Sequence, residues 1–491
     1  MKARLLFSVL LAAIAAAAEP TAPSRALSLA GAFPAPQAVD VPPDAPLRLT
    51  FATPPALGSG GLIRITDTTN GEIVETIDTS KPTAVQTIGG LPGYNYYPIT
   101  FSGTQATIHP RNGALTYGRT YAVTIDAGVF RDAVGPLGAI DGAAGWRFST
   151  RAAPPRTGTS RLIVAADGTG DFCTVQGAFD FIPASNTTPV TVFVRRGTYT
   201  EIVCLLEKHV VTLEGEDRTG TVIAYANNER FNPNSGRHPY QSPSGDPSRV
   251  EPGSLDRVYR RGMFLAHRTE GLVLRNLTFR NTTPHGGSQA EAVIVNGTTT
   301  ARTVIRDVDL FSYQDTLQVN GQAYVANCRI EGDVDFLWGT GPVLFENCVA
   351  RSLRSDAYYT QVRNPPGRHG FVFLRCTFEG EPGVTGNVLS RIQPWRFPES
   401  EVVLIECVLG PSVSPVGWEH QGGRPEGLGD LTRLRFWEFA SRDPAGAAID
   451  ASRRLAGSRQ LDAVADAALI ASYRDPAFVL GNGWNPRTAR E

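Results

Sequence analysis

Cysteine, methionine and net charge are all scarce in this chain. Six cysteines among 491 residues are too few for a disulfide scaffold, and they lack the CxxC spacing of a zinc site. The 46 basic and 47 acidic residues leave a formal net charge of −1, which argues against a nucleic-acid binder. The seven histidines show no metal-ligand spacing. We therefore expect no metal, no other cofactor and no nucleic-acid partner.

Long apolar runs are also missing, except at the start of the chain. Met1–Arg4 is basic, Leu5–Ile14 is apolar but too short to span a bilayer in the mature protein, and Ala16–Ala18 is a small-residue cleavage site. These features predict a signal peptide over residues 1–18. The mature protein is then exported, to the periplasm or the extracellular space, and no membrane partner is expected.

Helical patterns are rare as well, and 50 glycines with 36 prolines indicate many turns. Residues 19–150 alternate short apolar strands with turn residues, which is typical of a β-sandwich. This segment resembles the bacterial immunoglobulin-like domains of exported proteins, on the motifs Phe33–Pro46, Leu115–Tyr121 and Trp146–Thr150. Residues 151–159 form the expected linker. The expected strands are Leu47–Phe51, Leu62–Ile65, Ile73–Ile77, Ala106–Ile108, Tyr121–Ile125 and Trp146–Phe148.

Residues 160–491 continue with short, numerous strands separated by irregular turns, a pattern that suits a parallel β-helix. Thr174–Ile182 has helical spacing and is expected to cap an open end of the β-helix, and Leu461–Tyr473 is expected to form a longer helix. The expected strands are Val190–Val194, Val210–Leu213, Thr221–Ile223, Leu272–Leu274, Ala292–Val295, Thr303–Ile305, Ala323–Val325, Val343–Phe345, Phe371–Leu374 and Val402–Ile405.

Four cysteines recur in one local pattern, which consists of a polar residue, the cysteine and then, directly or one position later, an apolar residue. They are Cys328, Cys348, Cys376 and Cys407, at intervals of twenty to about thirty residues. We interpret them as small buried side chains that stack from coil to coil. A disulfide between neighbouring coils remains an alternative in an oxidising compartment.

Two aspartates stand among apolar and aromatic neighbours, Asp315 in Tyr313–Leu317 and Asp335 in Gly332–Gly339. Burying such a carboxylate is costly unless its charge is used or compensated. The two residues are twenty positions apart, so in a fold whose coils repeat at about that length they lie one above the other. Stacked carboxylates repel, which favours one protonated and one ionised group. The pair therefore predicts a nucleophile or base beside an acid.

Five blocks of the chain form one ordered set: Val164–Gln176, Arg196–Glu201, Leu274–Thr282, Tyr313–Leu317 and Val334–Gly339. In this order they resemble the signature blocks of the pectin methylesterases. This resemblance implies a right-handed parallel β-helix that removes methyl esters from polygalacturonate without a metal. The expected partner is pectin (homogalacturonan), on which the enzyme is expected to act as a monomer. The resemblance covers roughly Arg161–Pro486.

The resemblance also implies catalytic roles. Asp335 is expected to attack the ester carbonyl, and Asp315 to protonate the departing methanol and then deprotonate water. Gln314 and Gln289 are expected to hold the developing oxyanion. Ester cleavage needs these groups whatever the family, because it requires a nucleophile, a proton donor for the leaving group and donors aimed at the oxyanion.

Arg391 and Trp395 stand in Leu389–Trp395, which resembles a late block of the family but carries one substitution and two inserted residues. The resemblance implies that Arg391 fixes the nucleophile, where its charge keeps Asp335 ionised. Trp395 and Trp338 offer flat faces for sugar rings. A structural salt bridge remains the alternative for Arg391, and core packing the alternative for both tryptophans.

Other functions stay open at this stage. Glu291 stands where the family usually has an apolar residue, and with the altered arginine block it leaves a non-catalytic polysaccharide-binding protein as an alternative. Two carboxylates also suit a glycosidase. A serine mechanism is disfavoured, because Gly286–Ala290 lacks the second glycine and the following helix of that motif. An esterase for another ester is suggested by the insertion Asn227–Arg261, whose arginines are expected to meet an anionic ligand: Arg230, Arg237, Arg249, Arg257, Arg260 and Arg261.

Overall fold

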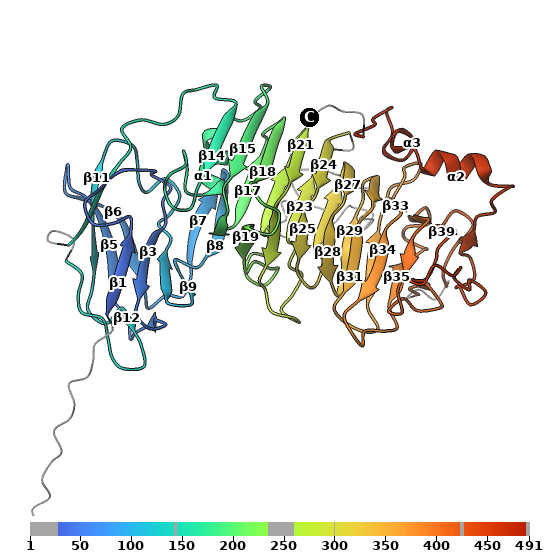
Figure 1. Cartoon of the computed structure of the whole chain (residues 1–491), viewed down its shortest axis with the longest axis horizontal. Helices are drawn as coiled ribbons and strands as arrows, with labels where there is room; N and C mark the ends of the chain where they lie inside the picture. The colour runs from blue at the N-terminus through green and yellow to red at the C-terminus, as the bar shows by residue number, and fades with distance from the viewer. Residues whose placement is uncertain (1–27, 142–144, 234–259, 299, 423–426, 488–491) are drawn as a thin grey trace, which may run out of the picture.

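The computed structural model describes residues 28–141, 145–233, 260–298, 300–422 and 427–487. A sandwich of mainly antiparallel strands lies at one end of the molecule, and a long stack of parallel strands extends from it (Figure 1). The expected signal peptide lies outside the described residues.

The sandwich consists of strands whose buried and exposed residues alternate, as the sequence predicts. In β3, Leu47, Leu49 and Phe51 point into the core, where they meet Phe148 of the facing sheet. One sheet has the order β1-β3-β10-β9 and the other β2-β13-β11-β5-β6, while β12 pairs with β4 and β7 with β8. The strands are β1 (Leu29–Phe33), β2 (Ala38–Val41), β3 (Leu47–Phe51), β4 (Ala56–Leu57), β5 (Leu62–Asp67), β6 (Glu72–Asp78), β7 (Ala84–Ile88), β8 (Leu91–Tyr96), β9 (Ile99–Ser102), β10 (Gln105–Ile108), β11 (Thr120–Ile125), β12 (Phe130–Arg131) and β13 (Trp146–Thr150).

The parallel stack has three sheets, and successive strands of the chain pass from one sheet to the next. The predicted parallel β-helix is therefore confirmed. The first sheet contains β14 (Arg161–Val164), β15 (Val190–Val194), β18 (Val211–Gly215), β21 (Leu272–Arg275), β24 (Arg302–Arg306), β27 (Gln322–Ala326), β30 (Val343–Glu346), β33 (Phe371–Leu374), β36 (Glu401–Ile405), β39 (Arg435–Phe439) and β40 (Arg459–Gln460). The second contains β16 (Gly197–Thr200), β19 (Thr221–Tyr225), β22 (Thr278–Asn281), β25 (Asp309–Phe311), β28 (Arg329–Gly332), β31 (Val349–Ser352), β34 (Thr377–Gly380) and β37 (Val408–Leu409). The third contains β17 (Val203–Leu206), β20 (Phe264–His267), β23 (Val293–Asn296), β26 (Leu317–Asn320), β29 (Val334–Gly339), β32 (Tyr358–Val362), β35 (Val388–Ile392) and β38 (Trp418–His420).

One corner of the β-helix repeats the same backbone conformation in successive coils. Asn327, Asn347, Arg375 and Glu406 all have φ between 53° and 57°, and each precedes a buried cysteine. The backbone N–H of Cys348 donates to Sγ of Cys376 at 3.4 Å, so neighbouring cysteines are in contact. All six cysteines are free and buried. The predicted cysteine stack is therefore confirmed, and the alternative disulfide does not form.

Helices are short and lie at the two ends of the β-helix. The predicted first helix is confirmed as α1 (Val175–Phe181), where Oγ1 of Thr174 accepts from Gly177 N. The second prediction is partly wrong, because α2 (Ala467–Tyr473) begins six residues later than expected. There the Asp462 carboxylate accepts from Val464 N and Ala465 N, which holds a turn in place of a helix. A further helix, α3 (Pro476–Leu480), was not predicted. None of the described helices is long and apolar enough to cross a membrane.

The β7–β8 hairpin leaves the sandwich and lies beside β17 and β19 of the β-helix (Figure 1). Its Ile88 and Tyr94 belong to the core of the β-helix. Gly89 approaches so closely that a Cβ there would lie 2.3 Å from the carbonyl oxygen of Cys204, and its φ is 56°. Only glycine fits this contact. The hairpin therefore joins the two parts of the chain by packing.

Asp44, between β2 and β3, makes a second connection. Its carboxylate accepts hydrogen bonds from Cys173 N at 2.9 Å and from Thr174 N and Oγ1 at 2.7 Å each. Burial raises the pKa of Asp44, and these hydrogen bonds oppose that rise. The carboxylate thus satisfies backbone donors at the start of α1 from outside the β-helix.

We expect Asp44→Ala to lower the free energy of unfolding by about 1–3 kcal/mol, because it leaves these donors without their acceptor. Asp44→Asn keeps one acceptor oxygen and should lose less. Urea unfolding followed by tryptophan fluorescence measures both variants. An unchanged midpoint in Asp44→Ala would contradict the proposed connection.

Candidate functional site

Asp315 and Asp335 lie at equivalent corners of adjacent coils: Asp315 shortly precedes β26, and Asp335 is the second residue of β29. The pairing of Leu317 with Leu337 gives an offset of twenty residues, and Asp315 N donates to the carbonyl of Val334 at 3.0 Å. Both aspartates have left-handed backbone, with φ of 66° and 51°, a conformation that aspartate adopts more readily than most residues. Their exposed fractions are only 7% and 5%. The coil repeat therefore stacks two buried carboxylates.

Asp335 is held by Arg391, which comes from β35, two strands further along the third sheet. Nε of Arg391 donates to Oδ1 at 2.9 Å and Nη2 donates to Oδ2 at 2.6 Å. Such two-point pairs are the stronger form of this interaction. Burial raises the pKa of Asp335, and the guanidinium opposes that rise by stabilising the carboxylate. The ring of Tyr358 packs against Arg391, with the ring centroid 4.0 Å from the guanidinium carbon.

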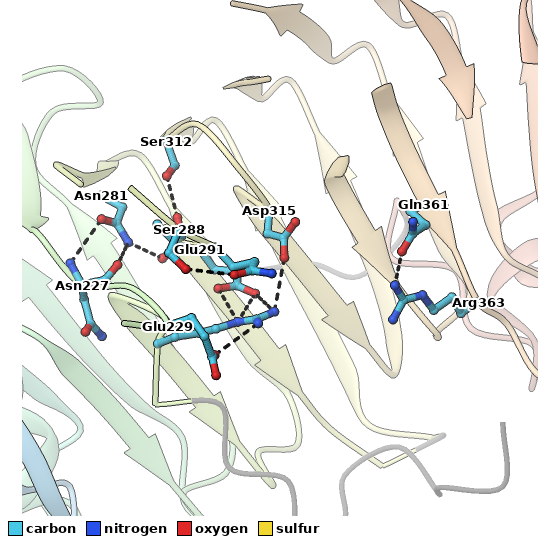
Figure 2. A network of polar contacts seen from close by, with 12 residues as sticks. Asn227, Glu229, Asn281, Ser288, Glu291, Ser312, Asp315, Gln361 and Arg363 are labelled. Atoms are coloured by element: carbon cyan, nitrogen blue, oxygen red, sulfur yellow. Dashed lines mark hydrogen bonds and ion pairs between the residues drawn. The ribbon is translucent and has the colours of Figure 1, made fainter. Parts of the chain in front are cut away.

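The carboxyl group of Asp315 contacts the guanidinium of Arg261, which also pairs with Glu229 and Glu291. Figure 2 shows the side chains of Glu229, Glu291 and Asp315 close together. Nη2 of Arg261 donates to Asp315 Oδ2 at 3.3 Å but to Glu291 Oε1 at 2.7 Å. Burial raises the pKa of Asp315 well above its usual range, Glu291 raises it further, and Arg261 opposes the rise. Asp315, with the weaker counter-ion, therefore keeps its proton more readily than Asp335.

The arginines of the insertion Asn227–Arg261 do not all have the role expected from the sequence, which was to bind an anionic ligand. Arg261 is buried against acids of its own chain, so the expectation that it meets an anionic ligand is wrong. Arg260 Nη1 donates to the carbonyl of Gly93 in the β7–β8 hairpin at 3.0 Å. Arg230 is exposed. The remaining three lie outside the described residues: Arg237, Arg249 and Arg257.

Gln314 and Gln289 lie on two segments that adjoin each other. Ala290 N donates to the carbonyl of Gln314 at 3.1 Å, which ties the segments together. Oγ of Ser288 donates to Oε1 of Gln289 at 3.0 Å, so the amide nitrogen of that side chain remains a donor. The side chain of Gln314 makes no hydrogen bond to another residue in the part of the chain that the structure describes. Both amides are neutral donors.

The two tryptophans occupy different surroundings. Trp338 is 7% exposed, and the guanidinium carbons of Arg261 and Arg363 lie 5.5 and 5.3 Å from its ring centroid. This placement favours the packing role over a sugar contact. Trp395 is half-buried in the turn after β35, close to Gly429, where a Cβ would lie 3.1 Å from Trp395 Cα.

Sequence reasoning missed several charged residues of the site. Asp333 pairs with Nε2 of His285 at 2.9 Å. Arg363 opposes the pKa rise of both catalytic candidates, and Figure 2 shows it beside Gln361, to which it donates. Gln361 pairs in register with Trp338 of β29. The alternation of a strand could have indicated that Gln361 and Arg363 share one face.

This arrangement supplies the parts of an acyl-transfer site: an ion-paired carboxylate, a second carboxyl whose pKa is raised, and neutral amide donors. Among the described residues, no group of three or more His, Cys, Asp or Glu side chains is arranged to hold a metal ion.

Comparison with known proteins identifies both parts of the chain. Residues 161–241 and 253–470 match the pectinesterase family, and residues 23–150 match the bacterial Ig-like domain family. The chain is 30% identical to Pectinesterase 31 of Arabidopsis thaliana over 313 residues, which cover 62% of this chain and 88% of that protein. It is 25% identical to Pectinesterase 1 of Citrus sinensis, over 66% of this chain and about half, 52%, of the citrus protein.

Solved structures show the same fold. Pectin methylesterase from carrot aligns with a TM-score of 0.52 and 23% identity, over 68% of this chain and 98% of the carrot protein. A pectin methylesterase from Aspergillus niger aligns with a TM-score of 0.51 and 21% identity, over 68% of this chain and 98% of the fungal protein. With its β-helix and its family match, the chain belongs to the pectinesterase family of carboxylic ester hydrolases and carries a bacterial immunoglobulin-like domain at its N-terminal side.

Proposed function

We propose that this protein hydrolyses the methyl esters of pectin to release methanol, with Asp335 as nucleophile and Asp315 as acid and base. The observation that carries the proposal is the stacked pair of buried carboxylates, of which only Asp335 has a two-point pair with an arginine. The matches to pectinesterases support the substrate class.

In the first step, an oxygen of Asp335 attacks the carbonyl carbon of the ester and the electron pair moves onto the carbonyl oxygen. The amides of Gln314 and Gln289 donate to this oxyanion. When the intermediate collapses, the carbon–oxygen bond to the methoxy group breaks and the leaving oxygen takes the proton of Asp315. The products are methanol and a galacturonoyl–aspartyl anhydride.

In the second step, the ionised Asp315 removes a proton from water, whose oxygen attacks the galacturonoyl carbon. The anhydride bond breaks, and Asp335 departs as a carboxylate paired with Arg391. The free acid is released and Asp315 again carries its proton. Both aspartates therefore return to their starting states without a metal or other cofactor.

We also propose a location, a partner and an oligomeric state for the protein. The N-terminal run Met1–Ala18 supports export by a signal peptide, so pectin outside the cytoplasm is the proposed partner. We propose that a single chain is sufficient, since the two aspartates, the two amides and Arg391 all come from one β-helix.

Asp335→Asn should lower methanol release from highly methylated pectin by at least about 10³-fold, because removal of a nucleophile abolishes the covalent route. Reducing ends are measured in the same samples. Methanol without new reducing ends in the parent distinguishes an esterase from a glycosidase. A folded Asp335→Asn variant with parental activity would overturn the proposed mechanism.

Gln314→Leu should lower kcat by about 10²–10³-fold with little change in KM, since an oxyanion donor acts mainly in the transition state. The near-isosteric leucine limits packing changes. Steady-state methanol release gives both constants. A rise in KM alone would assign Gln314 to substrate binding.

Arg391→Gln should move the acid limb of the pH profile of kcat/KM to higher pH, by roughly one pH unit or more. Arg391 stabilises the ionised form of Asp335, so its loss raises that pKa and leaves less nucleophile at low pH. Arg391→Lys keeps the charge and should shift the limb less. An unchanged acid limb would show that Arg391 does not affect the ionisation of Asp335.

A further inference from the structure

Arg261 lies at the centre of an ion-pair cluster that the proposed reaction steps do not use. The residue is 7% exposed. Its Nε donates to both oxygens of Glu291 at 2.9 and 3.0 Å, and its Nη2 donates to Glu291 Oε1 at 2.7 Å. Nη1 donates to Glu229 at 3.3 Å, and Nη2 also reaches Asp315 at 3.3 Å. A fully buried ion pair thus touches the proposed acid.

We propose that Arg261 and Glu291 are positioning residues for Asp315, which hold its carboxyl group in place and keep it able to exchange a proton. This inference rests on the acid and base role proposed for Asp315. Neither residue contacts the reacting ester in the proposed steps, so both act through Asp315.

The distances explain why the glutamate is needed. An arginine alone beside Asp315 would pair with it and keep it ionised, which would remove the proton donor. Instead, Glu291 accepts several shorter hydrogen bonds from the guanidinium, whereas Asp315 accepts a single one at 3.3 Å. Burial, Glu291 and Asp335 raise the pKa of Asp315, while Arg261 and Arg363 lower it, and the net direction is strongly upward. The pair therefore orients Asp315 without holding it ionised.

The backbone on both sides of this pair is fixed by two buried asparagines, Asn227 and Asn281 (Figure 2). Nδ2 of Asn227 donates to the carbonyls of Arg260 and Gly262, at 2.8 Å each, which flank Arg261. Nδ2 of Asn281 donates to the carbonyl of Asn227 at 2.6 Å and to that of Glu291 at 3.0 Å. Because these hydrogen bonds fix the backbone of Arg261 and Glu291, the two side chains can hold the carboxyl group of Asp315 in a defined position.

The same network reaches the immunoglobulin-like domain. Nδ2 of Asn232 donates to Oδ1 of Asn227 and to the carbonyl of Asn95, at 2.9 Å each. Asn95 N returns a hydrogen bond to Oδ1 of Asn232 at 2.7 Å. Asn232 and Asn227 therefore link the β7–β8 hairpin to the backbone that carries Arg261, beside the direct hydrogen bond from Arg260 to Gly93.

Glu291→Gln tests the inference in the full chain, with methanol release measured across pH. The variant removes a negative charge near Asp315 and leaves Arg261 unbalanced, and both changes favour the ionised form of Asp315. The alkaline limb of kcat/KM should therefore move to lower pH, by about one pH unit. Glu229→Gln is the matched control and should shift the limb less, because the carboxylate of Glu229 is more exposed to solvent and reaches Nη1 of Arg261 at 3.3 Å, whereas Asp315 is contacted by Nη2.

A double variant, Glu291→Gln with Arg261→Met, removes both charges and covers the case in which the single variant fails to fold. It should return the alkaline limb close to that of the parent, with a lower kcat because Asp315 is less well oriented. A uniform loss of activity without a shifted limb in Glu291→Gln, or a double variant whose limb stays displaced, would overturn the inference. An inactive parent would instead overturn the proposed function.

Discussion

Every part of the proposed active site depends on the register between adjacent coils. Strands β26 and β29 of the third sheet pair with an offset of twenty residues, so the corner that precedes β26 recurs at the start of β29. That repeat stacks Asp315 over Asp335 and allows Arg391, two strands further on, to reach the second aspartate. A one-residue slip would turn each of these side chains to the other face of its strand. The stack of buried cysteines at another corner follows the same register and helps to maintain it.

The two aspartates differ because their counter-ions differ. Both are buried, which by itself favours the neutral form. Arg391 offers Asp335 two short hydrogen bonds, whereas the guanidinium near Asp315 is mostly engaged by Glu291. The fold therefore separates the proton affinities of two chemically identical groups by how completely each is paired. The same principle assigns acid and nucleophile in other carboxylate pairs.

The sequence predicted the elements that depend on local patterns. The strands, the cysteine stack and the twenty-residue spacing of the aspartates follow from alternation and repeats, which the chain shows directly. The cluster around Arg261 did not follow, because its partners lie 30 and 54 residues away in sequence. Six arginines in one insertion look alike, and only the folded chain shows that Arg261 turns inward. The late start of α2 was missed because turn formation by Asp462 competes with helical periodicity.

Because of the β7–β8 hairpin, the sandwich and the β-helix form one structural unit. A chain cut between β13 and β14 would lose Ile88 and Tyr94 from the core of the β-helix and would expose the surface around Cys204 that the hairpin covers. It would also lose the partner of Asn232. In protein engineering, the portable catalytic module therefore starts at β1, and a fusion or an exchange of domains has to carry the sandwich along with the β-helix.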